Sequence, residues 1–322
     1  MPKLLLLRFS SIGDLVLTTP VIRALAKQTS YEIHLLTKKR FAPVLAHNPY
    51  LTKIYTFEQE VDEVLSYLKK ERYSFLIDLH KNLRSFRVRL ALGVKTYDFS
   101  KKNIEKWLMV QFKVNRLPEQ HIVDRYFEAV LPLGVKNDKA GLDYFLDPEE
   151  QLLIDLPTSY LVIVLGAAHY TKQIPVHKIK EVIGQLSIPV VLIGGLAEAA
   201  MGKTIQQQFP RKVVNLAGLQ SLGQSASVIK GARVVLTPDT GMMHIAAAFK
   251  KPILAMWGNT IPDFGMYPYR TEHINFEVPA LSCRPCSKIG RKICPRGHFR
   301  CMEDQNVKRM VDKIRILWER IA

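Results

Sequence analysis

One stretch, residues 232–260, limits the fold of this chain more strongly than any other. Residues 234–236 form a short β-branched run, which is typical of a buried strand. Pro238 and Gly241 bracket a turn, residues 242–249 have helical spacing, and residues 252–257 form a second buried run. The pattern predicts a strand, a turn, a helix and a parallel strand. It places the turn at the carboxyl end of a strand, where open α/β sheets bind ligands.

The side chains of this turn suit a phosphorylated sugar. Gly241 lets the backbone approach a ligand, and Thr240 and the amides that begin the helix can bind phosphate. Asp239 can accept hydrogen bonds from sugar hydroxyls, and His244 lies in or near the first helical turn. A purely structural interpretation is equally open, in which Asp239 caps the helix, Gly241 serves the turn and His244 is bonded within the core.

Strand-loop-helix patterns recur along the rest of the chain. Because 322 residues are too many for one ordinary core, we predict an α/β protein of two domains, 1–150 and 158–302. Residues near 138–157 lose periodicity and gather Asp, Glu and Pro, as a linker does. An amphipathic helix within residues 303–322 closes the chain, and we expect it to pack back on the first domain.

The net charge of +17, from 46 Lys or Arg against 29 Asp or Glu, predicts a polyanionic partner. Nucleic acid, an anionic membrane face and a phosphorylated glycolipid all fit. The charge is concentrated, since residues 69–116 hold thirteen Lys or Arg against four acidic residues. Lys81, Arg84 and Arg87 follow a predicted strand there and suit the phosphates or carboxylates of a ligand. A solvated basic face is the simpler alternative.

Targeting and membrane signals are weak in this sequence. Residues 4–7 form an apolar run too short for the core of a signal peptide, and Arg8 interrupts it. We find no convincing apolar run of the ~20 residues that a membrane span needs. We therefore expect a cytoplasmic protein.

The four cysteines of the chain lie close together, as Cys283, Cys286, Cys294 and Cys301. Structural disulfides are improbable in the cytosol. A C-x-x-C pair followed by two more thiols suits tetrahedral zinc, so the segment predicts a structural zinc site. Four reduced thiols in a surface loop remain the alternative.

Two motifs resemble glycosyltransferase family 9, the bacterial lipopolysaccharide heptosyltransferases. One is the Asp239-Thr240-Gly241 turn with His244, followed by the strand that ends in Gly258-Asn259-Thr260. The other is the segment 8–14, Arg-Phe-Ser-Ser-Ile-Gly-Asp, followed by Thr18-Thr19-Pro20. The resemblance implies the GT-B architecture, with two Rossmann-like βαβ domains facing each other across a cleft. It assigns the acceptor to the N-terminal domain and the nucleotide sugar to the C-terminal one.

The family resemblance also implies a reaction and its residues. Heptose passes from ADP-heptose to the inner core of lipopolysaccharide, a lipid A–core acceptor, with inversion and without a catalytic metal. Asp14 is implied as the general base. The implied donor-binding residues are Thr171, Lys172, Glu198, Asp239, Thr240, Gly241 and His244. The implied acceptor-binding residues are Ser10, Gly13, Lys81, Arg84 and Arg87. The enzyme is expected to associate peripherally with the anionic inner face of the inner membrane and not with nucleic acid.

Two alternatives compete with this interpretation. The same fold can use another nucleotide sugar or another acceptor. A basic nucleic-acid-binding protein would fit the charge and a zinc loop, but it leaves two ligand-type turns at strand ends unexplained.

Overall fold

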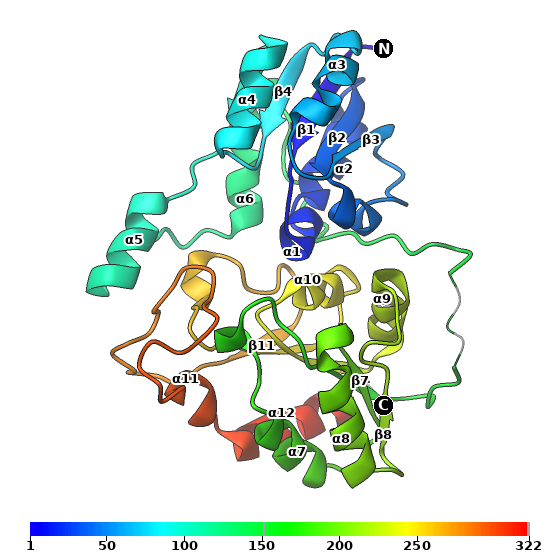
Figure 1. Cartoon of the computed structure of the whole chain (residues 1–322), viewed down its shortest axis with the longest axis vertical. Coiled ribbons are helices and arrows are strands. Elements are labelled where there is room, and N and C mark those ends of the chain that lie inside the picture. The colour runs from blue at the N-terminus through cyan, green and yellow to red at the C-terminus, as the bar shows by residue number, and fades with distance from the viewer. Residues whose placement is uncertain (151, 153, 321–322) are drawn as a thin grey trace. The chain divides into compact units, whose positions relative to one another are not determined.

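The computed structural model describes residues 1–150, 152 and 154–320. Positions 151 and 153 of the predicted linker and positions 321 and 322 of the last predicted segment lie outside these residues. The chain forms two compact units, Met1–Lys101 with Gln120–Phe145 and Lys102–Glu119 with Leu146–Ala322. Each unit is a parallel sheet with helices on both faces (Figure 1).

The sheet of the first unit has the order β3-β2-β1-β4-β5. Its strands are β1 (Lys3–Leu7), β2 (Glu32–Lys38), β3 (Lys53–Phe57), β4 (Phe75–Asp78) and β5 (Lys95–Asp98). β1 is the middle strand, since Leu4 pairs with Ile33 of β2 on one side and with Phe75 of β4 on the other. Its four leucines are fully buried. A run that is apolar on both faces is what a covered parallel sheet requires.

Helices cover both faces of this first sheet. They are α1 (Ile12–Val16), α2 (Thr19–Gln28), η1 (Lys39–Val44), α3 (Asp62–Lys70), α4 (Leu83–Leu92), α6 (Ile122–Phe127) and η2 (Leu131–Leu133). α3 and α4 bury Val64, Leu68 and Val88 against Leu5 and Leu76 of the strands. α2 and α6 pack together.

The sheet of the second unit has the order β11-β10-β9-β6-β7-β8. Its strands are β6 (Leu161–Val164), β7 (Val190–Ile193), β8 (Val213–Asn215), β9 (Val234–Pro238), β10 (Ile253–Met256) and β11 (His273–Phe276). Its longer helices are α5 (Asn103–Phe112), α7 (Val176–Gly184), α8 (Ala199–Gln208), α9 (Leu222–Gly231), α10 (Gly241–Ala248) and α12 (Val307–Arg320). Single turns are η3 (Tyr170–Lys172), η4 (Leu196–Glu198), η5 (Pro262–Phe264) and α11 (Arg300–Glu303). This confirms the prediction for residues 232–260, since β9, α10 and β10 follow one another and the two strands are parallel neighbours.

The last helix does not behave as the sequence led us to expect. The apolar stripe of α12, which includes Met310, Ile314 and Leu317, is buried in the core of the second unit beside α7. The expectation that it packs on the first domain was therefore wrong for the described part of this helix. The helix lies there because its apolar stripe packs against the core of its own unit, next to β9.

A second difference concerns residues 102–119, which the predicted boundaries assign to the first domain. Contacts place them with the second unit. The Lys113 ammonium donates to the Pro285 carbonyl at 2.7 Å, and the Asn115 side chain donates to Asp263 at 2.9 Å. These long-range bonds lie beyond what a local sequence pattern can predict.

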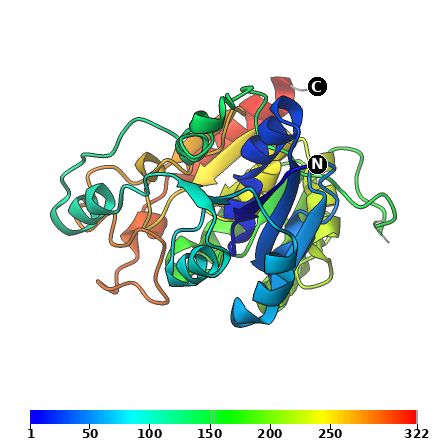
Figure 2. The same ribbon diagram turned by 90° about the horizontal axis from the view of Figure 1, so that it is seen from above.

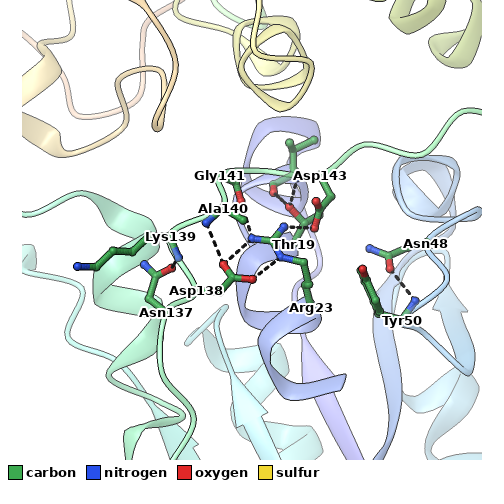
Figure 3. A network of polar contacts seen from close by, with 11 residues as sticks. Thr19, Arg23, Asn48, Tyr50, Asn137, Asp138, Lys139, Ala140, Gly141 and Asp143 are labelled. Carbon is green, nitrogen blue, oxygen red and sulfur yellow. Dashed lines mark hydrogen bonds and ion pairs between the residues drawn. The ribbon is translucent and has the colours of Figure 1, made fainter. Parts of the chain in front are cut away.

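Arg23 of α2 organises a polar network in the first unit (Figure 3). Its guanidinium is buried and donates to both carboxylate oxygens of Asp138, at 2.7 and 2.8 Å, and to the Gly141 carbonyl at 2.8 Å. It also pairs with Asp143, whose amide donates to the Thr19 hydroxyl at 2.9 Å. The network fastens the segment 138–143 to α2.

Replacing Arg23 by methionine should lower the free energy of unfolding by about 3–5 kcal/mol, because it leaves two partly buried carboxylates without their cation. The matched control is Arg320→Met, since Arg320 pairs with Glu272 on the exposed surface. Such exposed pairs contribute little to stability, because solvent screens the two charges. Urea denaturation of both variants measures the difference, and equal losses would contradict the structural role given to Arg23.

Within residues 1–150, 152 and 154–320, no helix combines the length and the apolar character needed to cross a bilayer.

Candidate functional site

Each sheet reverses its strand order at one point, and the predicted site residues gather there. In the first sheet the reversal lies between β1 and β4, and in the second between β6 and β9. Ligands of open α/β sheets bind outside the carboxyl ends of the strands at such switch points. The loops that follow these four strands are therefore the candidate sites.

Asp14 is the third residue of α1, which follows β1, and it has two partner residues, Arg8 and Ser11. Its carboxylate forms an ion pair with Arg8. The amide and the hydroxyl of Ser11 donate to its Oδ2 at 3.1 and 2.9 Å. Asp14 therefore stabilises the start of α1, as the structural interpretation expects, and its side chain remains about one-fifth exposed.

The environment of Asp14 keeps this carboxyl group ionised. Burial raises its pKa, but the charge of Arg8 and the hydrogen bonds from Ser11 outweigh burial, so the pKa lies below its usual value. An ionised carboxylate can accept a proton from a substrate hydroxyl.

Arg8 connects the two loops of the first switch point. Its guanidinium donates to the Leu79 carbonyl after β4 at 2.5 Å and to the Tyr126 hydroxyl at 3.0 Å. Its Nε donates to the Ser10 carbonyl at 2.8 Å. In the same loop, burial and the charge of Arg8 lower the pKa of His80 to about 3, so His80 is neutral near pH 7. The sequence analysis gave Arg8 no role, although Arg8 begins the motif of residues 8–14.

The predicted acceptor-binding residues lie in the same unit, and several already have acidic partners. Lys81 donates to Asp98 at 3.0 Å. Arg84 and Arg87, on α4, both pair with Glu60 at 3.0 Å, and Arg87 also pairs with Asp62. Their charge is therefore partly balanced within the protein. Ser10 and Gly13 flank the Ser11–Asp14 contact, and a role in acceptor binding stays a prediction for all five residues.

The second switch point holds a compact charged cluster. Lys172 follows β6, Asp239 follows β9 and Thr260 follows β10. The Lys172 ammonium lies 2.6 Å from Oδ2 of Asp239, and the Thr260 hydroxyl donates to the same oxygen at 2.8 Å. Both charged side chains keep only a small exposed fraction, 16% for Lys172 and 11% for Asp239. The structure thus joins the two predicted donor-binding turns.

The remaining residues of the Asp-Thr-Gly turn begin α10. Thr240 is the N-cap, Gly241 is the first helical residue, and both are half-buried. His244 is buried in the second half of the first turn. The free amides at the start of α10 are suited to phosphate.

Glu198 lies at the start of α8 and reaches the loop that follows β6. Its Oε2 accepts from the Gly195 amide at 2.9 Å. A Cβ on Gly166 would lie 2.8 Å from the same carboxylate, so only glycine allows this close approach. The structure thus places the Glu198 carboxylate against the loop that carries Lys172.

Thr171 precedes Lys172 in the chain, but its side chain is bonded to two other loops of the protein. It is buried, and its hydroxyl accepts from the Arg291 amide at 2.8 Å and bonds to Asn259 at 3.0 Å. The hydroxyl is thereby committed to holding two loops together. Arg284 extends this clamp, donating to the Gly258 carbonyl at 2.6 Å and to the Thr260 carbonyl at 2.8 Å.

The cysteine loop, residues 281–301, therefore packs directly against the loops that follow β6 and β10. All four cysteines line one cavity of about 20 Å³ beside Thr171 and Asn259. Burial raises the pKa of the Cys286 thiol and raises that of Cys301 to about 12. His298 Nε2 lies 3.9 Å from the Cys283 sulfur. In the described part of the chain, no three His, Cys, Asp or Glu side chains are arranged to hold a metal ion.

A family model for glycosyltransferase family 9 (heptosyltransferase) matches residues 63–295. The chain belongs to glycosyltransferase family 9. It is therefore a glycosyltransferase, and family membership disfavours the nucleic-acid-binding alternative that its charge left open.

This family 9 chain is similar in sequence to proteins that are named heptosyltransferases. It is 25% identical over 317 residues to lipopolysaccharide heptosyltransferase 1 of Pseudomonas aeruginosa, covering 89% of this chain and 86% of that protein. It is 34% identical over 91 residues to lipooligosaccharide heptosyltransferase 2 of Haemophilus influenzae, a match that spans 27% of this chain and 26% of that protein.

Solved structures confirm the GT-B fold, with two α/β units that each contain a parallel sheet. Escherichia coli ADP-heptose lps heptosyltransferase II has a TM-score of 0.73 and 19% identity, covering 99% of both chains. E. coli heptosyltransferase WaaC with ADP-2-deoxy-2-fluoro heptose has a TM-score of 0.62 and 21% identity, covering 84% of this chain and 92% of that one.

Proposed function

We propose that this family 9 enzyme transfers heptose from ADP-heptose to the lipid A–core region of lipopolysaccharide, with inversion of the anomeric carbon. The observation that carries the proposal is the Lys172–Asp239–Thr260 cluster at the switch point of the second sheet. The names of its relatives and the ADP-sugar analogue bound to WaaC support this donor and acceptor.

On the acceptor side, Asp14 is the proposed general base. Its carboxylate takes the proton of the acceptor hydroxyl as that oxygen bonds to the anomeric carbon of heptose. The bond from the anomeric carbon to the ADP oxygen breaks in the same displacement, and ADP leaves with the electron pair. One displacement inverts the anomeric centre, through a transition state with oxocarbenium character.

On the donor side, Lys172, Thr240 and the first amides of α10 stabilise the negative charge that develops on ADP. Asp239 orients the heptose hydroxyls and positions Lys172 through their 2.6 Å contact. Glu198 is proposed to accept from the ribose, with Gly241 and His244 completing the pocket. Thr171 contributes indirectly, by holding the loop of its neighbour Lys172. This scheme requires no catalytic metal.

The Arg8–Asp14 ion pair makes a prediction about pH. Arg8 favours the ionised form of Asp14, so Arg8→Gln should raise the pKa of Asp14. The base must be unprotonated to accept the proton. As the pH is lowered, the variant should therefore lose activity at a higher pH than the wild type does. The acid limb of kcat/KM should therefore move to higher pH.

Tyr126→Phe is the matched control for the Arg8 variant. It removes a neutral hydrogen-bond partner of Arg8 but keeps the positive charge, so its acid limb should stay near that of the wild type. An Arg8→Gln profile that coincides with the wild-type profile would refute the proposed role of Arg8.

We also propose that the enzyme works in the cytoplasm, peripherally associated with the anionic inner face of the inner membrane, because its acceptor is a lipid. The net charge of +17 supports this location. Ser10, Gly13, Lys81, Arg84 and Arg87 are proposed to contact the acceptor.

The cysteine loop is proposed to hold a structural zinc ion. Four cysteine sulfurs are a preferred zinc ligand set, and all four line one cavity of about 20 Å³. The sulfurs must close around the ion, since they are not arranged for ligation in the described structure. The four cysteines would hold the ion, which would crosslink a loop that already contacts Thr171 and Thr260.

Protein purified without added metal should accordingly contain about one zinc ion per chain. Elemental analysis gives the content, and thiol titration gives the number of free cysteines. A content below about a tenth of that value, with all four thiols titratable, would establish a reduced thiol loop instead.

Thermal unfolding with different sugar nucleotides tests the donor. A ligand at a hundred times its Kd stabilises the native state by about 2.7 kcal/mol, so ADP-heptose should raise the midpoint clearly. UDP-glucose and GDP-mannose should not. A larger shift with another sugar nucleotide, and none with ADP-heptose, would favour the same fold acting on a different donor.

A further inference from the structure

Helix α5 exposes an unusual amount of apolar surface. Every residue of α5 is exposed or half-buried. Ile104 is 73% exposed, Trp107 53% and Phe112 62%. A surface helix of a globular protein normally buries its apolar stripe against the core. Figures 1 and 2 show α5 lying apart from the sheet of its unit.

The exposed apolar side chains share one side of α5. Positions 104, 107, 108 and 112 fall on a common face at helical spacing. The rings of Trp107 and Phe112 contact each other edge-on, with centroids 5.3 Å apart. The two rings thus form a continuous apolar patch, which marks an interaction site.

Basic residues lie on the side of α5 opposite to this patch. Lys102, Lys106, Lys113 and Arg116 lie in or beside α5, and Glu105 is the opposing acidic residue between positions 102 and 116. Lys102 and Glu105 lie 3.8 Å apart, so that pair is partly balanced. The segment keeps a net positive charge, which complements an anionic partner and disfavours a second copy of this basic chain.

The helix is anchored at its C-terminal end. The Lys113 ammonium donates to the Pro285 carbonyl of the cysteine loop, and Asn115 donates to Asp263 of η5. The apolar face is therefore presented from a fixed base and is not the fraying end of a loop. A face with Trp and other apolar residues, opposite a face with Lys, is typical of helices that lie in a membrane interface.

We propose that α5 is the membrane-docking helix of this enzyme. Ile104, Trp107 and Phe112 insert at the level of the lipid headgroups, and the positive charge of Lys102, Lys106 and Arg116 attracts the helix to anionic lipid. This inference deepens the membrane association proposed above and rests on it. It names the surface and commits to a bilayer as the partner.

Vesicle co-sedimentation of the full chain tests the docking helix. The wild type should bind vesicles of equal parts phosphatidylethanolamine and phosphatidylglycerol, and bind pure phosphatidylcholine much less. The double variant Trp107→Ala/Phe112→Ala should bind at least about tenfold more weakly, because it removes two aromatic side chains from the interface. Lys102→Gln and Lys106→Gln should each weaken binding about fivefold, less so at high salt.

Ile316→Ala is the matched control, since Ile316 is a 52% exposed apolar residue on α12. Its vesicle binding should equal that of the wild type. All of these variants should keep wild-type transfer to a delipidated, soluble acceptor, which separates failure of docking from failure of the proposed function. Wild-type binding by the aromatic double variant would overturn the inference. So would a dimer that this variant converts to monomer without any change in vesicle binding.

Discussion

Replacing Asp14 by asparagine is expected to slow heptose transfer by a factor of about 10²–10⁴ and to leave ADP-heptose affinity nearly intact. Asparagine keeps the size of the side chain and can still accept hydrogen bonds from Ser11. It cannot take the proton of the acceptor hydroxyl. The donor residues Lys172 and Asp239 belong to the second unit, so donor binding should survive the change.

The control for this variant is Glu58→Gln, which neutralises an exposed glutamate of the same unit and should keep full activity. Calorimetry with ADP-heptose reports whether the Asp14 variant is folded, because its Arg8 loses an ionic partner. Near wild-type turnover at saturating acceptor would show that Asp14 only stabilises the start of α1.

The second large effect is expected for Lys172→Ala. A hydrogen bond to a charged group contributes about 1.5–3 kcal/mol, so ADP and ADP-heptose should bind roughly 10- to 150-fold more weakly. The structure adds a second reason for the loss, since Asp239 keeps its negative charge when its 2.6 Å partner is removed. That charge then repels the diphosphate.

The double variant Lys172→Ala/Asp239→Asn separates the two contributions. If part of the loss comes from the unbalanced Asp239, the double variant binds ADP more tightly than Lys172→Ala alone. Lys203→Ala, an exposed lysine on α8, is the matched control and should bind ADP like the wild type. Unchanged ADP affinity in Lys172→Ala would remove Lys172 from the donor site.

The sequence predicted the fully buried interior strands best. β9 and β10 are interior strands of their sheet, and all of their residues are buried. β5 and β11 were missed, and both are terminal strands of their sheets with half-buried or exposed residues. An edge strand is covered less completely than a central one, so its sequence lacks a continuous apolar run.

Helices were predicted well where they bury a stripe. α12 was found because its apolar stripe is complete, whereas α5 was missed because it buries no residue at all. The segment that follows the first loop forms two helices, α1 and α2, which meet near Thr18. Pro20 lies in the first turn of α2, where its missing amide is tolerated.

Site residues within one motif were predictable, and their partners were not. Asp239 and Lys172 were each assigned from local turns, but their contact depends on the strand order that makes β6 and β9 neighbours. Thr171 shows the same limit, because the Arg291 amide that binds its hydroxyl lies 120 positions away in the sequence. Arg8 was overlooked because nothing in its own segment predicts the contacts with Leu79 and Tyr126.

The most direct test of the proposed function is the mass of the acceptor after incubation with the purified enzyme. With ADP-heptose and a lipid A–core acceptor that lacks heptose, the acceptor should gain one heptose residue while an equal amount of ADP appears. Neither change should occur with the Asp14→Asn variant beyond a small residual rate. An acceptor mass that stays constant with ADP-heptose but rises with another sugar nucleotide would contradict the proposed function.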